Sequence, residues 1–196
     1  MKKRAKAENV TLDFIAEAGL LKRVKRSGWW VLGMPCEESV ADHSFRCAVI
    51  GYILAEKEGA DPYKVLMMTL FNDIHEARIT DMHKMAHSYV DVRAAEKKAF
   101  ASQVSKLPEP IKRTLKKMRE EHDRQETKES LVARDADILE CLIQAKEYTD
   151  MGAKNAKKFF KKGPSKLRTK SARDLWKNTK DWDSGKWWEK LGEFKR

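Results

Sequence analysis

Apolar residues recur every three or four positions through most of this 196-residue chain, and this helical period limits the possible folds more than any other feature. Few stretches alternate apolar and polar residues as a half-buried strand does, and clusters of Gly or Pro are scarce. The pattern therefore predicts an all-α fold. The predicted helices cover residues 11–24, 39–58, 62–77, 91–105, 108–121 and 127–151.

Local signals place several of the helix boundaries. Thr11 is the predicted N-cap of the first helix. Asp61 followed by Pro62 marks the start of the third, because Pro sacrifices no hydrogen bond in a first helical turn. Residues 25–38, "KRSGWWVLGMPCEE", break the periodicity and are predicted to form an ordered loop, and "KKGPSK" (161–166) is a second break.

The length of the chain suits one domain over residues 1–196. We expect a helical core over residues 12–151 and a C-terminal extension over residues 152–196. Residues 171–191 hold four of the six Trp residues, and we expect this segment to fold back onto the helical bundle. Trp clustered in a charged segment is typical of buried anchors, so we also expect a homodimer.

The net charge of +11 is concentrated near the C-terminus. Residues 153–196 hold 15 Lys and Arg against 5 Asp and Glu, whereas residues 1–152 hold 26 against 25. A solvated, Lys-rich helical surface is the simpler interpretation. Binding of nucleic acid through this basic tail is the alternative.

No stretch of the sequence predicts a membrane segment. The longest nearly unbroken apolar run, residues 47–55, is less than half of the about 20 residues that a spanning helix needs. The N-terminus carries basic residues without the apolar segment of a signal peptide. We therefore expect a cytoplasmic protein.

Polar side chains stand on three of the predicted apolar helix faces. The groups are His43 on the second helix, Asn72, Asp73 and Glu76 on the third, and Asp137 on the sixth. An ionised Asp that faces inward costs several kcal/mol unless it is paired or bound to a metal. Such groups therefore need a physical reason.

Two interpretations account for these inward polar groups. Imidazole with carboxylates is a donor set that suits a divalent transition metal, with open positions for water and substrate. The alternative is a buried hydrogen-bond network in which Arg46 or Arg134 supplies the counter-charge. The residues by themselves leave both open.

Three sequence segments carry a resemblance to a known family. "ESVADHSFR" (38–46), "NDIHEARITD" (72–81) and "RDADILECLIQAKEY" (134–148) resemble the metal and substrate motifs of the HD-domain phosphohydrolases, in particular the 5′-deoxynucleotidase branch. An early segment of that branch is similar to "LKRVKRSGW" (21–29). The resemblance covers residues 12–151.

The resemblance implies an α-helical HD domain that binds one divalent metal ion, Mn, Co or another transition metal, with Mg as a further option. It implies removal of the 5′-phosphate from (deoxy)nucleoside monophosphates, and homodimers are common in the family. The implied metal ligands are His43, Asp73 and Asp137. Asn72 stands where the family has its second ligand His.

The resemblance also implies roles around the phosphate and the sugar. Glu76 matches the position of the general acid or base. Asp81, the second implied catalytic residue, matches the position that contacts the sugar 3′-hydroxyl and helps to exclude a 2′-hydroxyl. Arg26 is expected near the phosphate and Trp29 in the wall of the pocket.

Asn72 is the one departure from the family pattern. An amide oxygen is a weaker, neutral donor than an imidazole nitrogen for a transition metal, so we expect weakened metal binding and impaired activity. His75 does not replace the missing ligand, because three helical positions turn it away by about 60°. The alternative function is a non-catalytic nucleotide- or nucleic-acid-binding protein with the same fold.

Overall fold

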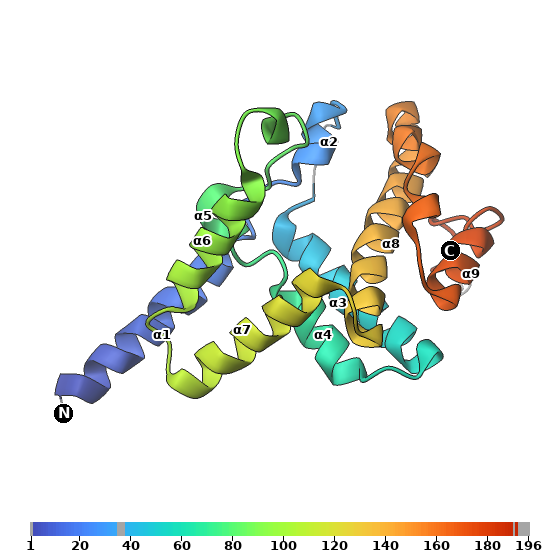
Figure 1. Ribbon diagram of the computed structural model, residues 1–196. Coiled ribbons are helices and arrows are strands. Elements are labelled where there is room, and N and C mark those ends of the chain that lie inside the picture. The colour runs from blue at the N-terminus through green and yellow to red at the C-terminus, as the bar shows by residue number, and fades with distance from the viewer. Residues whose placement is uncertain (1, 35–37, 190, 192–196) are drawn as a thin grey trace.

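Helices form the regular structure of this protein, whose computed structural model describes residues 2–34, 38–189 and 191 (Figure 1). Within these ranges there is no strand, only one isolated bridge between Lys25 and Ser39. The all-α prediction is therefore confirmed. The α-helices are α1 (Lys2–Leu20), α2 (Ser27–Val31), α3 (Val40–Glu58), α4 (Pro62–Phe71), α5 (Glu76–Ile79), α6 (Val92–Val104), α7 (Glu109–Arg124), α8 (Lys128–Asp150) and α9 (Lys170–Asn178). The short 3-10 helices are η1 (Ala86–Ser88), η2 (Lys154–Lys161) and η3 (Pro164–Lys166).

Three helices, α3, α4 and α8, pack against one another and form the centre of the molecule. Leu54, Val65 and Leu139 come from these three helices and have no exposed surface. Figure 1 shows α1, α5 and α6 on one side of this centre and α9 on the other. The central helices carry the inward polar groups that the sequence singled out.

Side-chain caps fix where the central helices begin. Ser39 and Asp42 form a reciprocal capping box at the start of α3. Asp61 accepts hydrogen bonds from the backbone N–H groups of Tyr63 and Lys64, so the predicted start of α4 is confirmed. Thr127 caps α8 in the same way as Ser39 caps α3.

Three predicted boundaries are wrong. Thr11 is not an N-cap, because α1 already begins at Lys2 in a stretch rich in helix-forming Ala, Lys and Glu. The predicted loop 25–38 contains the short helix α2, which buries Trp29. The predicted third helix does not continue to residue 77, because α4 ends at Phe71.

A tertiary contact accompanies the end of α4. The carbonyl oxygen of Asn72 accepts a hydrogen bond from Arg119 Nη1 on α7 at 2.9 Å and lies 3.1 Å from His75 Nδ1. The tighter turn over residues 72–75 then leads into α5. Because side chains take up the helix-terminal carbonyl, the chain can leave the helical path without losing that bond.

The C-terminal segment packs partly against the bundle. Helix α9 contacts α3 and α8, and the ring of Trp176 lies 5.2 Å from that of Phe160. Trp182, Trp187 and Trp188 remain 37%, 64% and 47% exposed. The homodimer stays a prediction.

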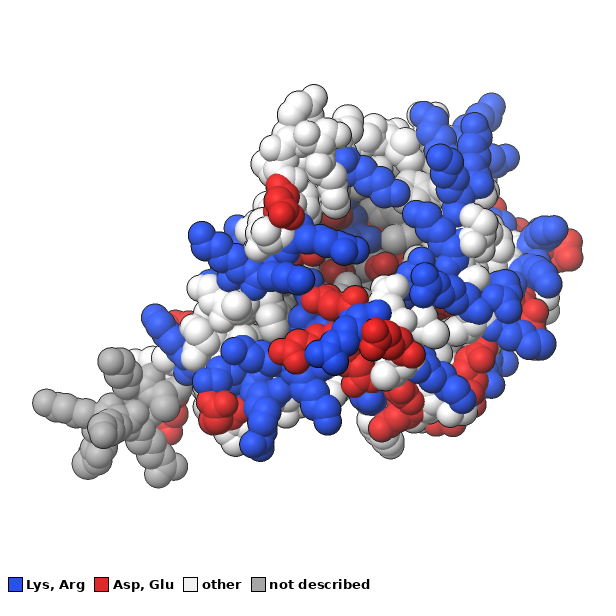
Figure 2. Space-filling view, viewed as in Figure 1, with Lys and Arg blue, Asp and Glu red and all other residues white. Residues whose placement is uncertain are grey.

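Lys and Arg side chains cover much of the face in Figure 2, and a hollow opens in its middle with acidic atoms inside. In the orientation of Figure 1 this hollow lies between α2 and α8. Among the described residues, no helix is long and apolar enough to cross a membrane.

A buried carboxylate fastens the C-terminal segment to α8. Asp135 has no exposed surface, and its Oδ2 accepts hydrogen bonds from the backbone N–H groups of Arg168 and Thr169 at 2.8 and 2.6 Å. The hydroxyl of Thr169 donates a third bond at 2.9 Å. These bonds fix the chain just before α9.

We predict that Asp135→Asn lowers the free energy of unfolding by about 2–3 kcal/mol, because an ionised acceptor makes stronger hydrogen bonds than an amide oxygen. Urea denaturation measures the change. Asp174→Asn is the control, since the ion pairs of Asp174 with Lys170 and Lys177 are exposed and their loss should leave stability nearly unchanged. Equal effects of the two substitutions would contradict the proposed anchoring by Asp135.

Candidate metal centre

His43, in the first turn of α3, lies at the centre of the buried polar groups. Its side chain has no exposed surface, and its Nδ1 donates to Glu140 Oε2 at 2.5 Å. On the other side of the ring, Nε2 lies 3.0 Å from Asp137 Oδ1 and 3.6 Å from Asp73 Oδ2. The structure thus brings α3, the turn after α4, and α8 together at one imidazole.

Glu140 sets the orientation of that imidazole. Burial opposes its ionisation, but the hydrogen bond from His43 and the charges of His43 and Arg46 lower its pKa overall. An ionised Glu140 holds the proton on Nδ1, so a metal ion that displaced the proton of Nε2 would bind at Nε2, as in many metal-bound histidines.

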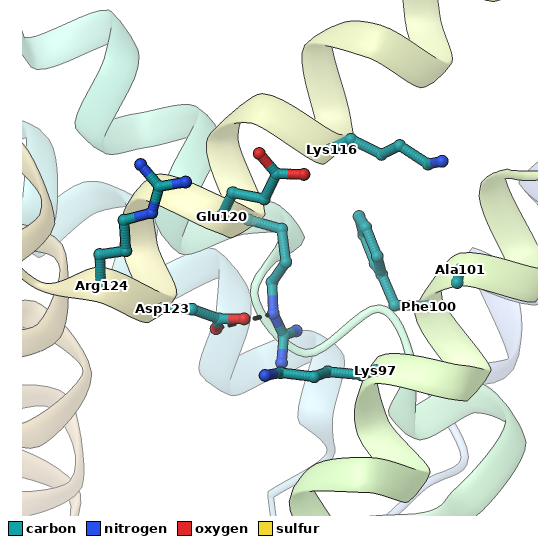
Figure 3. Close-up of a pocket in the computed structure, with 8 residues that line it drawn as sticks. Lys97, Phe100, Ala101, Lys116, Glu120, Asp123 and Arg124 are labelled. Atoms are coloured by element: carbon teal, nitrogen blue, oxygen red, sulfur yellow. Dashed lines mark hydrogen bonds and ion pairs between the residues drawn. The ribbon is translucent and has the colours of Figure 1, made fainter.

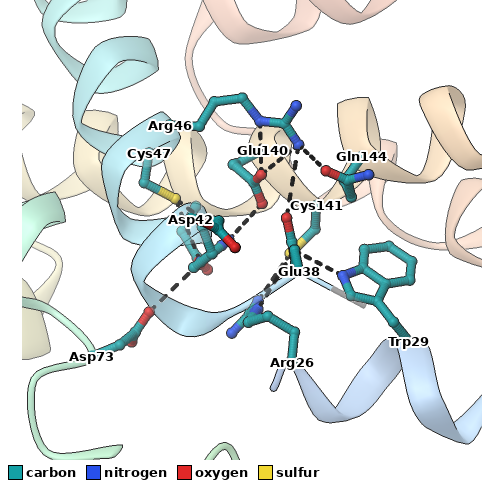
Figure 4. Close-up of polar contacts among 12 residues, drawn as sticks. Arg26, Trp29, Glu38, Asp42, Arg46, Cys47, Asp73, Glu140, Cys141 and Gln144 are labelled. Carbon is teal, nitrogen blue, oxygen red and sulfur yellow. Dashed lines mark hydrogen bonds and ion pairs between the residues drawn. The ribbon is translucent and has the colours of Figure 1, made fainter. Parts of the chain in front are cut away.

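Arg46 supplies the counter-charge for Glu140. Its guanidinium donates to Glu140 at 2.7 and 2.9 Å and to Gln144 at 2.5 Å (Figure 4). It also donates to Glu147 at 2.7 and 2.9 Å. Arg134 instead lies 3.4 Å from Asp135. The buried hydrogen-bond network that the sequence offered as an alternative to a metal site is therefore present around Glu140. It lies beside the cluster of His43, Asp73 and Asp137 and does not replace that cluster.

The charges on the Nε2 side of His43 suit a divalent cation. Burial raises the pKa of Asp137, but the hydrogen bond and charge of His43 bring it down to about 2. Burial and Arg26 lower the pKa of His43, yet Cys47 and the hydrogen bond to Asp137 leave it well above its ordinary value. Two carboxylates thus draw positive charge to this point, and a metal ion would provide it.

Two thiols lie beside the same imidazole, and their chemistry separates them from the carboxylates. Cys47 and Cys141 can each be grouped with His43 as donors to a metal. Burial raises the pKa of Cys141 to about 12, and it also raises the pKa of Cys47. Because only a thiolate is a strong ligand, the nitrogen of His43 with carboxylate oxygens is the better donor set.

Asn72 contacts the cluster through Asp73. Its amide Nδ2 donates to Asp73 Oδ1 at 2.7 Å, while Asp73 Oδ2 faces His43. The amide therefore orients the carboxylate of Asp73.

Glu76 is a buried carboxyl with one oxygen that no protein group satisfies. It is 8% exposed, and its Oε2 has no hydrogen-bond partner among the described residues. Burial, together with the negative charges of Asp73 and Asp81, raises its pKa well above the ordinary value. The raised pKa favours the protonated form of Glu76, and its Oε2 is available to a ligand.

Arg26 and Asp81 meet at the mouth of the cluster. The backbone N–H of Ser27 donates to Asp81 Oδ2 at 2.8 Å, and Arg26 Nη1 lies 3.5 Å from the same oxygen. Arg26 Nη2 also donates to Cys141 Sγ at 3.2 Å. Two of the expected substrate-binding residues are thus adjacent.

Trp29 is buried more deeply than a residue that lines a pocket. It is 1% exposed, its Nε1 donates to Glu38 Oε1 at 2.7 Å, and its ring packs on Tyr148 and Phe159. Figure 4 shows the indole pointing toward Glu38, whose other neighbours are Arg26 and Arg46. A role of Trp29 in substrate binding stays a prediction.

One cavity adjoins the cluster, and a second cavity lies next to the first. The first, of about 340 Å³, is lined by residues that include Asn72, Asp73, Glu76 and His122. The second, of about 440 Å³, lies between α6 and α7 (Figure 3). Both share Lys97, Arg119, Asp123 and Arg124, so basic side chains extend from the cluster along α7.

Sequence reasoning missed two acidic residues of the site. Glu140 follows Asp137 by one helical turn, and this spacing was the available signal. Glu38 belongs to a segment without periodicity, so no pattern indicated that it faces inward.

Glu38 makes the stability of the protein depend on pH, and this dependence can be measured. Burial and the charge of Glu140 raise the pKa of Glu38 to about 7, against 4.5 for the free side chain. A carboxyl whose pKa is higher in the folded state binds its proton more tightly there. Its contribution to stability is therefore fully present below pH 4.5 and is lost as the pH rises through 7.

We predict that Glu38→Gln, which mimics the protonated form and keeps the acceptor for Trp29, removes this pH dependence. Relative to the native protein, the variant should gain about 1–3 kcal/mol between pH 5 and pH 8. Denaturant titrations at both pH values measure the gain. Glu126→Gln, a substitution at an exposed position, is the control. If the stability of the two variants depends on pH to the same extent, the assignment of this pH dependence to Glu38 is contradicted.

Comparison with known proteins shows the family to which the fold of this chain belongs. An HD domain model matches residues 18–178. The protein named 5′-deoxynucleotidase HDDC2 in Dictyostelium discoideum is 30% identical over 147 residues, which cover 70% of this chain and 76% of that protein. The human protein of the same name is 27% identical over 141 residues, which cover 71% and 69%.

Solved structures agree with this result. A conserved hypothetical protein from Pyrococcus furiosus superposes with a TM-score of 0.74 at 36% identity, over 87% of this chain and 99% of that chain. A predicted metal-dependent phosphohydrolase from Magnetospirillum magnetotacticum has the same fold, with a TM-score of 0.71 at 22% identity over 89% of this chain and 91% of that one. Because the matching family model reaches from the end of α1 to the end of α9, the chain belongs to the HD-domain family.

Proposed function

We propose that this protein is a metal-dependent phosphohydrolase that removes the 5′-phosphate from (deoxy)nucleoside monophosphates. The observation that carries the proposal is the cluster of His43, Asp73 and Asp137 with the buried Glu76, whose pKa is raised, beside it. The relatives named 5′-deoxynucleotidase support the nucleotide as substrate.

In this proposal His43, Asp73 and Asp137 hold one divalent metal ion. Bound there, such an ion would polarise a phosphate and activate a water molecule for attack. Asn72 keeps Asp73 in place through the amide hydrogen bond. Glu140 keeps His43 in the tautomer that presents Nε2.

Glu76 acts as the general acid. Its raised pKa favours the protonated form, and its Oε2 without a hydrogen-bond partner is available to a ligand in the cavity that Glu76 lines. As water adds to phosphorus and the bond to the 5′ oxygen breaks, the proton moves from Glu76 to the leaving oxygen. Such proton transfer contributes about 10²–10⁴-fold to a rate.

Arg26 and Asp81 orient the substrate. The guanidinium of Arg26 offers a bidentate fork to a phosphate, and its pairing with Asp81 keeps it at the mouth of the cluster. Asp81 is fixed by the N–H of Ser27 and accepts from a sugar hydroxyl with its remaining lone pairs. Trp29 supports this region through Glu38.

Asn72 favours one alternative, a non-catalytic nucleotide- or nucleic-acid-binding protein. The two proposals differ in their products. A nucleotidase releases inorganic phosphate from deoxynucleoside monophosphates when Mn²⁺, Co²⁺ or Mg²⁺ is added, whereas a binding protein retains the nucleotide unchanged.

We predict phosphate release by the native protein and its loss in Asp73→Asn, because the neutral amide removes a negative donor from the metal site. Metal-dependent thermal stabilisation should disappear in the same variant, as expected when the folded state no longer binds the ion. Colorimetric phosphate assays and melting curves measure both. Binding of deoxynucleotide without release of phosphate would support the alternative.

We predict that Glu76→Gln lowers kcat about 10²–10⁴-fold and leaves metal affinity within threefold, since Glu76 donates a proton and does not bind the ion. Glu96→Gln is the matched control. Glu96 lines the same cavity but already lies 3.6 Å from Arg119, and its loss should change kcat less than tenfold. A wild-type kcat in Glu76→Gln rules out the acid role.

A further inference from the structure

The last turn of α7 places a second imidazole beside the metal site. Arg119 Nη1 donates to the carbonyl of Asn72 and lies 3.2 Å from His75 Nδ1, so this face of α7 is fixed against the turn that carries Asp73. His122 follows Arg119 by three positions and therefore lies on the same face.

The surroundings of His122 connect it to the carboxylates of the site. His122 lines one cavity with Asn72, Asp73 and Glu76, and a second, smaller cavity again with Asn72. Burial lowers the pKa of His122, whereas the charges of Asp137 and Asp73 raise it, so both carboxylates lie within electrostatic reach of the ring.

The ring of His122 has no protein partner of its own. Among the described residues, none forms a hydrogen bond or an ion pair with it. His75, by contrast, is already held by Asn72, Glu96 and Arg119. His122 is thus the free imidazole on the cavity that Asn72 and Asp73 share.

Asn72 provides no nitrogen donor to the metal site, and the imidazole of His122 can provide one. Its amide donates to Asp73 and offers no ring nitrogen, so the cluster of His43, Asp73 and Asp137 contains a single nitrogen donor. Transition metals bind imidazole nitrogen more strongly than a neutral amide oxygen.

We propose that His122 supplies the nitrogen donor that Asn72 lacks, so that the metal is bound by His43, Asp73, His122 and Asp137. The inference rests on the metal site of the proposed function and adds a ligand from α7. Coordination requires the ring to turn toward the carboxylates, and no hydrogen bond or ion pair with a described residue opposes that rotation.

Metal affinity tests the proposal independently of catalysis. The metal-free protein is titrated with Mn²⁺ and with Co²⁺ in a calorimeter. His122→Ala is expected to weaken binding at least 10-fold, because it removes a direct ligand. His87→Ala is the matched control, since His87 is an exposed imidazole on η1, and its affinity should equal that of the native protein.

A double substitution separates loss of a ligand from loss of packing. Asn72→His combined with His122→Ala moves the nitrogen donor from α7 to the turn before α5, and it should recover most of the lost affinity. The gain in metal affinity from Asn72→His should be larger in the His122→Ala background than in the native protein, because the native site already has a nitrogen donor from His122.

Pulsed electron paramagnetic resonance of bound Mn²⁺ counts the imidazole nitrogens directly when the protein carries ¹⁵N-labelled His. We expect two coupled imidazoles in the native protein and one in His122→Ala. One imidazole in both, or equal affinity in both, overturns the assignment of His122 and leaves the phosphohydrolase proposal intact. Absence of metal binding by the native protein overturns the two together.

Discussion

The buried imidazole of His43 is the interaction on which the rest of this site depends. It has no exposed surface and lies between Glu140 on one side and Asp73 and Asp137 on the other. Carboxylates gathered in a medium of low polarity are unfavourable unless positive charge lies close to them. Arg46 provides that charge to Glu140, and we assign a divalent cation to the other two carboxylates.

The fold delivers the three sides of the site by separate means. A capping box starts α3 just before His43. Arg119 on α7 holds the turn that carries Asp73, through a hydrogen bond to the neighbouring carbonyl. Helix α8 presents Asp137 and Glu140 one turn apart, and Asp135, two residues before Asp137, is anchored to the C-terminal segment. Each side is thus fixed by a polar contact outside the cluster itself.

The sequence predicted the parts of this structure that local physics decides. The helical spacing of apolar residues and the side-chain caps determine where the central helices begin. A polar group such as His43 on an apolar helix face indicates a site inside the protein. The end of α4 was missed because a distant residue, Arg119, contributes to it. Glu38 was missed because its segment has no period, and His122 because the predicted helix ended at residue 121, one residue before it.

Anomalous X-ray scattering from crystals soaked in Co²⁺ or Mn²⁺ tests the central claim most directly. Our account predicts one strong peak bounded by His43 Nε2 and the carboxylates of Asp73 and Asp137, with the ring of His122 turned toward it. A map without an anomalous peak among these side chains, at metal concentrations that stabilise the protein in solution, would contradict the account.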